Sequence, residues 1–150
     1  MKYIYITMMI FLVALLTANA GDQVKYKVST DKSVEQAVED FKINAKAKGF
    51  GTLHVHDISG TLKKKNMPIN DNVKVLEICN PKYAYQVLSE DLDMNMGLPC
   101  RVSVYTQNGK TVIGMVRPTV VLSAMSDSAK LAKLAKEVED IIIDIMNETK

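Results

Sequence analysis

The folded part of the chain begins with two different patterns of apolar residues. Residues 23–29 alternate between apolar and charged side chains, which predicts a strand with one buried face. From Ser33 the apolar residues follow a helical period, which predicts a helix that ends at Gly49. Ser33 and Gln36 have the spacing of a capping box, in which the two side chains satisfy free backbone N–H groups at the helix start.

The middle of the chain predicts two further strands. Residues 50–58 alternate again, and residues 73–79 are largely apolar, as expected of a strand in the centre of a sheet. Between them, Ser59 is expected to cap a short helical turn over residues 60–66. Proline and a cluster of Asn and Asp predict a loop over residues 67–72.

A short helix is predicted directly after the third strand. Asn80 is a favourable cap, and Pro81 suits the first helical position because its missing N–H group has no helical partner there. The apolar stripe continues to Leu88, and residues 89–97 are expected to form a loop or the frayed end of the helix.

A hairpin and a long helix are predicted at the end of the chain. Asn108-Gly109 lies between two alternating segments, and this dipeptide favours the tight turn that joins antiparallel strands, so a β-hairpin is expected over residues 101–116. A short apolar helix follows over residues 119–125. Ser126 or Asp127 is expected to cap a final amphipathic helix that runs to Asn147.

These elements predict the fold class α+β. The expected architecture has two layers, with a mixed sheet of about five strands backed by helices, the hairpin at 101–116 and the long C-terminal helix. A single domain is expected over residues 21–150, which is long enough to bury about two thirds of its unfolded surface without a disulfide.

The N-terminus has the layout of a secretory signal peptide over residues 1–20. A lysine precedes an apolar run over residues 3–16, and small residues follow, so cleavage is expected after Ala20. The run is short for a membrane span, and no stable membrane insertion is expected after cleavage. An uncleaved anchor is the alternative. The predicted location is the periplasm or the medium, as a secreted protein.

Charge argues against a nucleic-acid partner. The formal net charge is +2, and loss of Lys2 with the leader lowers it to +1, whereas dedicated nucleic-acid binders show a strong basic excess. Tryptophan is absent, so a stacking platform for bases is not evident.

Cys79 and Cys100 are the candidate functional thiols. In an exported protein two cysteines favour a disulfide, but a helical crossover would make their strands parallel and place the sulfurs at opposite ends of the sheet. Antiparallel strands would let the thiols meet. Two separate cysteines are preferred here. Cys79 directly precedes the helix start at Asn80 and Pro81, where a helix dipole would lower a thiol pKa, and inert packing is the alternative for each cysteine.

Two weaker patterns concern metals. His54 and His56 fall on one face of a strand and could supply two ligands for a transition metal, although solvated histidines are the preferred interpretation. Met94 and Met96, near the Cys100 thiol, would suit Cu(I), but packing is again preferred. No cofactor is predicted.

The order of several motifs resembles a known family. Ser33-Val-Glu-Gln-Ala-Val-Glu, Lys48-Gly-Phe-Gly, Cys79-Asn-Pro-Lys-Tyr-Ala and Leu98-Pro-Cys-Arg-Val-Ser-Val-Tyr are similar to the bacterial and archaeal domain-of-unknown-function family 302 across residues 24–146. The resemblance implies a small α+β domain able to form a homodimer. It implies no reaction, and the two histidines and two methionines are not part of its pattern.

Two functions are therefore expected from the sequence. The first is an exported, non-enzymatic module that binds a small ligand or a protein partner, and the second is a thiol-dependent envelope protein that handles redox equivalents, sulfur or a soft metal. Whether the protein is an enzyme is left open, and a non-enzymatic role is preferred.

Overall fold

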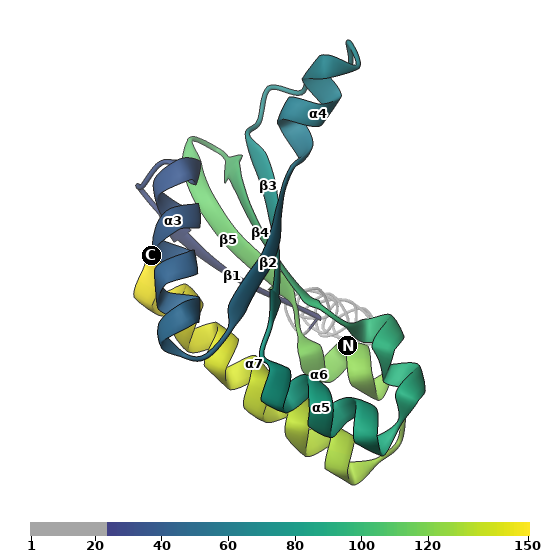
Figure 1. Ribbon diagram of the computed structural model, residues 1–150. Helices are drawn as coiled ribbons and strands as arrows, with labels where there is room; N and C mark the ends of the chain where they lie inside the picture. The colour runs from purple at the N-terminus through teal and green to yellow at the C-terminus, as the bar shows by residue number, and fades with distance from the viewer. Residues whose placement is uncertain (1–23) are drawn as a thin grey trace, which may run out of the picture.

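The computed structural model describes residues 24–150 and contains one five-stranded sheet (Figure 1). The strands are β1 (Lys25–Thr30), β2 (Gly51–Asp57), β3 (Val73–Cys79), β4 (Cys100–Gln107) and β5 (Lys110–Val116), in the spatial order β1-β5-β4-β3-β2. The predicted signal peptide lies outside the described residues. Within the described part, no helix is both long and apolar enough to cross a membrane.

The helices lie on one face of the sheet and at its two ends (Figure 1). They are α3 (Val34–Ala47), α4 (Ile58–Lys64), α5 (Pro81–Glu90), the 3-10 helix η1 (Leu92–Gly97), α6 (Pro118–Ser123) and α7 (Ala129–Thr149). Helix α3 and the second half of α7 cover the sheet, whereas the first half of α7 continues past the sheet and packs with α5 and α6. Helix α4 lies in an arm that projects beyond the opposite end. The predicted α+β class is confirmed.

All neighbouring strands are antiparallel, so the expected mixed sheet is wrong in that detail. The difference arises between β3 and β4. The chain leaves β3 into α5 and returns through η1 at the same end of the sheet, rather than crossing over one of its faces (Figure 1).

Local signals placed most element ends correctly. Ser33 and Gln36 form the expected capping box, and Asn108 and Gly109 form the hairpin turn with φ values of 52° and 76°. Two predicted caps are wrong. Asp57, not Ser59, caps α4, and Ser128, not Ser126 or Asp127, caps α7. In both cases a neighbouring oxygen acceptor is better placed to receive the backbone N–H bonds.

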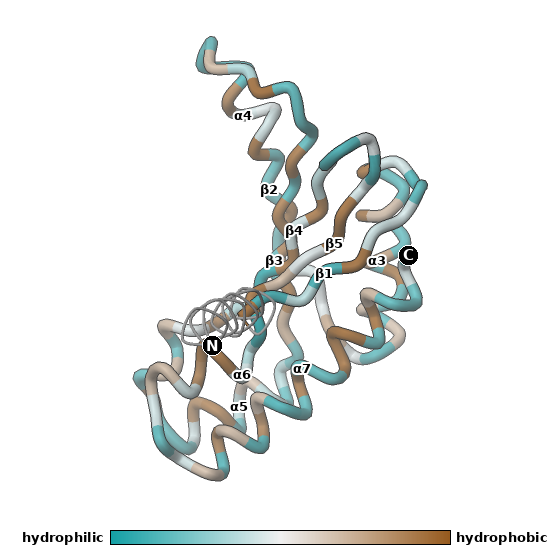
Figure 2. The backbone as a smooth tube through the Cα atoms, turned by 180° about the vertical axis from the view of Figure 1, so that it is seen from behind, coloured by the Kyte–Doolittle hydropathy of each residue, from teal (hydrophilic) through white to brown (hydrophobic). Residues whose placement is uncertain are grey.

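The buried side chains form two separate cores. The first lies between the sheet, α3 and the second half of α7, and includes Phe41, Leu76 and Ile142. The second lies among α5, η1, α6 and the first half of α7, and consists of Val87, Met94, Leu122, Leu131, Leu134 and Ala135. Figure 2 shows apolar residues recurring along α7. This helix is therefore the shared wall of both cores.

Candidate functional site: a cleft between the two cores

A cleft of about 670 Å³ lies where the two cores approach each other. Its walls include Ile78, Met115 and Ile142 from the first core, and Val87 and Leu122 from the second. The lining continues around the ends of β4 and β5 onto the face of the sheet that the helices do not cover. Clefts of this size and apolar character are typical of small-molecule sites.

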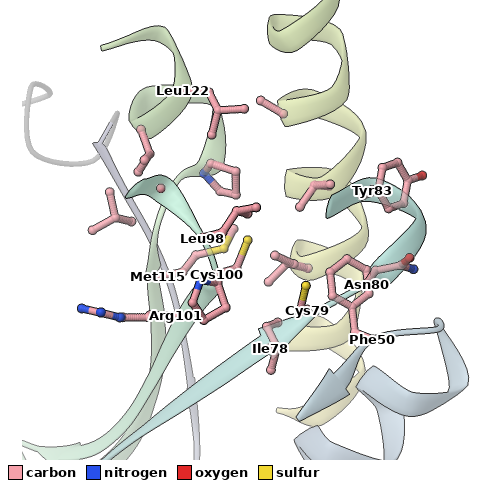
Figure 3. A pocket seen from close by; sticks show the side chains of 18 of the residues that line it. Phe50, Ile78, Cys79, Asn80, Tyr83, Leu98, Cys100, Arg101, Met115 and Leu122 are labelled. Carbon is pink, nitrogen blue, oxygen red and sulfur yellow. The ribbon is translucent and has the colours of Figure 1, made fainter. Parts of the chain in front are cut away.

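Both candidate thiols line this cleft. In the antiparallel register Cys100 pairs with Ile78, which places it diagonally beside Cys79. Figure 3 shows the two sulfurs side by side and pointing into the cleft. The preference for thiols at opposite ends of the sheet is therefore wrong, because it assumed a parallel crossover. Both cysteines are half-buried and unbonded.

Burial, not the helix dipole, dominates the acidity of these thiols. Burial raises the pKa of Cys79 above its ordinary value of 9.0. Burial, together with the charge of an ionised Cys79, raises the pKa of Cys100 to about 11. The expected activation of Cys79 by the start of α5 is thus wrong, because the apolar walls penalise the thiolate. Asn80 does cap α5, and its Oδ1 accepts a bond of 3.0 Å from the N–H group of Lys82.

Among residues 24–150, the charged residues in the cleft lining all carry positive charge. They are Lys25 and Lys27 on β1 and Arg101 on β4, and no described Asp or Glu lines the cleft. In Figure 3, Arg101 extends along one rim, away from the two sulfurs, and Phe50, Asn80 and Tyr83 lie on the other side. The cleft therefore combines an apolar interior with a cationic rim.

A buried ion pair fixes α6, one wall of the cleft. Arg117 Nη1 donates to Glu139 Oε1 on α7 at 2.7 Å, and the hydroxyl and backbone N–H of Thr119 donate to Glu139 Oε2. Burial alone would raise the pKa of Glu139, but the bonds from Thr119 and Arg117 outweigh it and leave that pKa below its ordinary value of 4.5. The carboxylate thus joins the start of α6 to α7.

Comparisons with known proteins were made for the whole chain. Residues 26–149 match the family described as "Domain of unknown function DUF302". The chain belongs to the DUF302 family. The DUF302 chain is also similar to a crystal structure of an uncharacterised conserved DUF302 protein from Bacillus stearothermophilus, with a TM-score of 0.82 and 29% identity over 85% of this chain and 98% of that one. The search of curated proteins gives no match.

The residues of this DUF302 chain that were predicted as candidate metal ligands do not form a single site. His54 and His56 lie side by side on β2 with ring centroids 4.4 Å apart, and His56 Nε2 is 3.1 Å from Glu77 Oε1. Met94 is buried in the second core, with 2% of its surface exposed, whereas Met96 is 73% exposed. Among residues 24–150, no group of three or more His, Cys, Asp or Glu side chains is arranged to hold a metal ion.

Sequence reasoning missed most residues of the cleft in this DUF302 protein. Leu134 and Val138 lie on the apolar face of the predicted amphipathic helix and are buried, but they also border the cleft. Apolar periodicity does not separate a packed wall from a cleft wall. Alternation along β4 gave one usable signal, because it places Arg101 and Ser103 on the face opposite buried Val102.

Proposed function

We propose that this DUF302 protein is a non-enzymatic binding module that holds a small, largely apolar ligand in the cleft between its two cores. The observation that carries the proposal is the cleft itself, with its volume of about 670 Å³ and walls from both cores. Its walls come from strands and helices rather than from long loops, and pre-formed sites of this kind lose little entropy on binding.

Binding of a neutral fluorescent probe tests this proposal. Phenylnaphthylamine carries no charge and brightens in apolar surroundings, so the purified full chain is expected to enhance its emission saturably. Ala84→Phe would fill the cleft from α5, and it is expected to weaken probe binding about tenfold or more, since an aromatic ring would displace the ligand.

The matched control is Ala132→Phe, on the exposed side of α7 and outside the cleft. It is expected to bind the probe as the unmodified chain does. Both variants keep residues 1–23 intact, so a difference between them reports on the cleft alone. Equal binding by all three proteins, with unchanged unfolding temperatures, would contradict the proposal.

A thiol-dependent function is the second candidate. The observation that favours it is the antiparallel register, which brings Cys79 and Cys100 together in the cleft. Oxidation by a peroxide would join the two sulfurs, with two protons and two electrons reducing the peroxide to water. The raised thiol pKa values oppose this reaction at neutral pH. Intact mass spectrometry with and without alkylation tests it, because two unmodified, unreactive cysteines after peroxide treatment would exclude it.

We also propose that the protein is exported and forms a homodimer. Export is supported by the leader pattern of residues 1–20 and would be shown by a mature N-terminus at Gly21. Dimerisation is supported by Leu53 on edge strand β2 and by Met67 and Ile69 in the arm, whose apolar side chains are exposed. A monomer in sedimentation at micromolar concentration would contradict dimerisation.

A further inference from the structure

We infer that the cleft takes a single-chain carboxylate, such as a free fatty acid, with its chain between the two cores and its head group at the cationic rim. This inference rests on the proposed function and names the ligand class for the same cleft. Four features carry it: the charge of the rim, the arrangement of the cations, the exposed apolar residues at the mouth and the free hydrogen-bond donors.

The rim cations have no anionic partner in the described part of the chain. Lys25, Lys27 and Arg101 form neither ion pairs nor side-chain hydrogen bonds with residues 24–150. Many other cations are paired, namely Lys32, Lys42, Lys48, Lys74, Lys110, Arg117, Lys130 and Lys136. Glu77 is the strand neighbour of Arg101, but its carboxylate contacts His56 instead. Within residues 24–150, nothing therefore prevents the rim from pairing with an anion.

The strand register places these cations in two adjoining rows on the open face of the sheet. Lys25 pairs with Val116, and Val102 pairs with Met115, so Arg101 lies opposite Val116 on the other side of β5. In the next row, Lys27 pairs with Gly114. A Cβ atom on Gly114 would lie 3.3 Å from Lys27 Cγ, so the missing side chain gives the lysine stem room to lie along the sheet.

The mouth of the cleft exposes apolar side chains that nothing in residues 24–150 covers. Val116 is 50% exposed and Met96 is 73% exposed, and both belong to the cleft lining. Val116 lies between Lys25 and Arg101 in the strand register, so exposed apolar surface adjoins the cations at the rim. Covering such surface stabilises a complex in proportion to the apolar area removed from water.

The uncharged polar groups of the lining include several donors. Ser103 and Tyr105 line the cleft, and their hydroxyl groups make no side-chain hydrogen bond with the described residues, whereas the Tyr83 hydroxyl points away from the two sulfurs (Figure 3). Lys27 Nζ lies 5.8 Å from the ring centroid of Tyr105, which gathers cation and hydroxyl on one part of the rim. A carboxylate only accepts hydrogen bonds, so this donor set matches it.

Competition by three ligands of equal chain length tests the inference. Dodecanoate, dodecanol and dodecylammonium would each displace phenylnaphthylamine from the full chain, at concentrations below the micelle limit of the two ions and the solubility limit of the alcohol. Dodecanoate is expected to bind about tenfold more tightly than dodecanol, and dodecylammonium more weakly than either, because the rim charge attracts one head group and repels the other. Added salt should reduce only the preference between head groups.

A charge-matched pair of variants locates the effect. The rim variant combines Lys25→Gln, Lys27→Gln and Arg101→Gln, and it is expected to lose about tenfold in dodecanoate affinity while dodecanol binding stays unchanged. The control combines Lys63→Gln, Lys64→Gln and Lys65→Gln at the end of α4, which removes the same charge far from the cleft. The control is expected to bind all three ligands as the unmodified chain does.

Each other outcome overturns the inference in a distinct way. Probe binding without a preference for dodecanoate would refute the ligand class and leave the proposed function intact, whereas no probe binding by either the full chain or a chain without residues 1–20 would refute both. Binding that appears only after removal of residues 1–20 would place the leader in the cleft, and binding that is lost on dimerisation would place a second copy there. Association with anionic vesicles in preference to the free carboxylate would make the rim a membrane contact.

Discussion

The sheet half of this DUF302 protein has a closed core, whereas the helical half has a smaller core that leaves a cleft open. In the first core, Phe41, Leu76 and Ile142 are fully buried, and α3 and α7 close over the sheet. In the second, the helices meet around a smaller core and leave the cleft open toward the sheet. We interpret the first core as the source of stability and the boundary between the cores as the functional part. Helix α7 belongs to both, so it couples them.

The largest expected effect compares two deletions on α7. Ile145 is fully buried in the first core and does not line the cleft, and Ile145→Ala is expected to lower the free energy of unfolding by about 4 kcal/mol. Leu134 borders the cleft, and Leu134→Ala is expected to lower it by about 2 kcal/mol, because the side chain already lies beside open space. Urea denaturation measures both. Equal losses would contradict the difference in packing.

The pKa of Cys100 tests the same comparison, because this thiol lies in the cleft. Because its pKa is raised from 9.0 to about 11, its thiolate fraction near neutral pH should be about one hundredth of that of an unfolded cysteine. The Cys79→Ser variant isolates this thiol, and its alkylation rate should still rise up to a pKa well above 9.0. The unfolded chain loses this proton first, so stability should fall between pH 9.0 and about 11. An alkylation midpoint at or below the ordinary value would contradict a desolvated site.

The Glu139 network is expected to matter less but to respond to acid. Glu139→Gln removes the charge that Arg117 and Thr119 stabilise, and it should lower the free energy of unfolding by about 2 kcal/mol at neutral pH. The folded pKa of this carboxyl is depressed, so its contribution is present above 4.5 and is lost as the pH falls through the lower folded value. The variant should therefore lose less stability than the unmodified chain on acidification. Parallel acid titrations would disprove the role.

The smallest expected effect concerns the hairpin turn. Gly109 has φ of +76°, and an added Cβ would meet nothing within 4 Å, so Gly109→Ala carries only the backbone penalty of about 1 kcal/mol. Lys136→Ala, which breaks an exposed pair with Asp140, serves as a surface control with a loss of about 0.4 kcal/mol. A thermal melt distinguishes the two. A loss at Gly109 as large as that at Ile145 would show that the turn, rather than the core, limits stability.

Local sequence signals predicted most of the fold because they act over a few residues. The Ser33–Gln36 capping box, the Asn80–Pro81 helix start and the Asn108-Gly109 turn each depend on neighbours in the chain. The pairing of β3 with β4 does not, because it depends on where the chain travels between Cys79 and Cys100. The assumption of a crossover helix therefore misplaced the thiols.

The cleft could not be predicted from the sequence for a related reason. Leu134 and Ile142 fall on the same apolar stripe, yet only the fold shows that one faces the second core and the other the first. The order of charges along the sequence likewise did not predict that Lys25 and Arg101 lie near each other. The two residues are far apart in the chain and come together only across β5. The net charge of the whole chain is close to zero, so it did not indicate that positive charges gather at the cleft rim.

Nuclear magnetic resonance titration of the full chain with dodecanoate tests the central claim most directly. The account predicts saturable shifts at backbone amides of α5, α6, the part of α7 up to Ile142 and the cleft-lining parts of β1, β3, β4 and β5, with α3 and the α4 arm unaffected. These are the segments that meet at the cleft between the two cores. Shifts confined to the α4 arm or to α3, or no saturable shift at all, would contradict the claim that the cleft is the binding site.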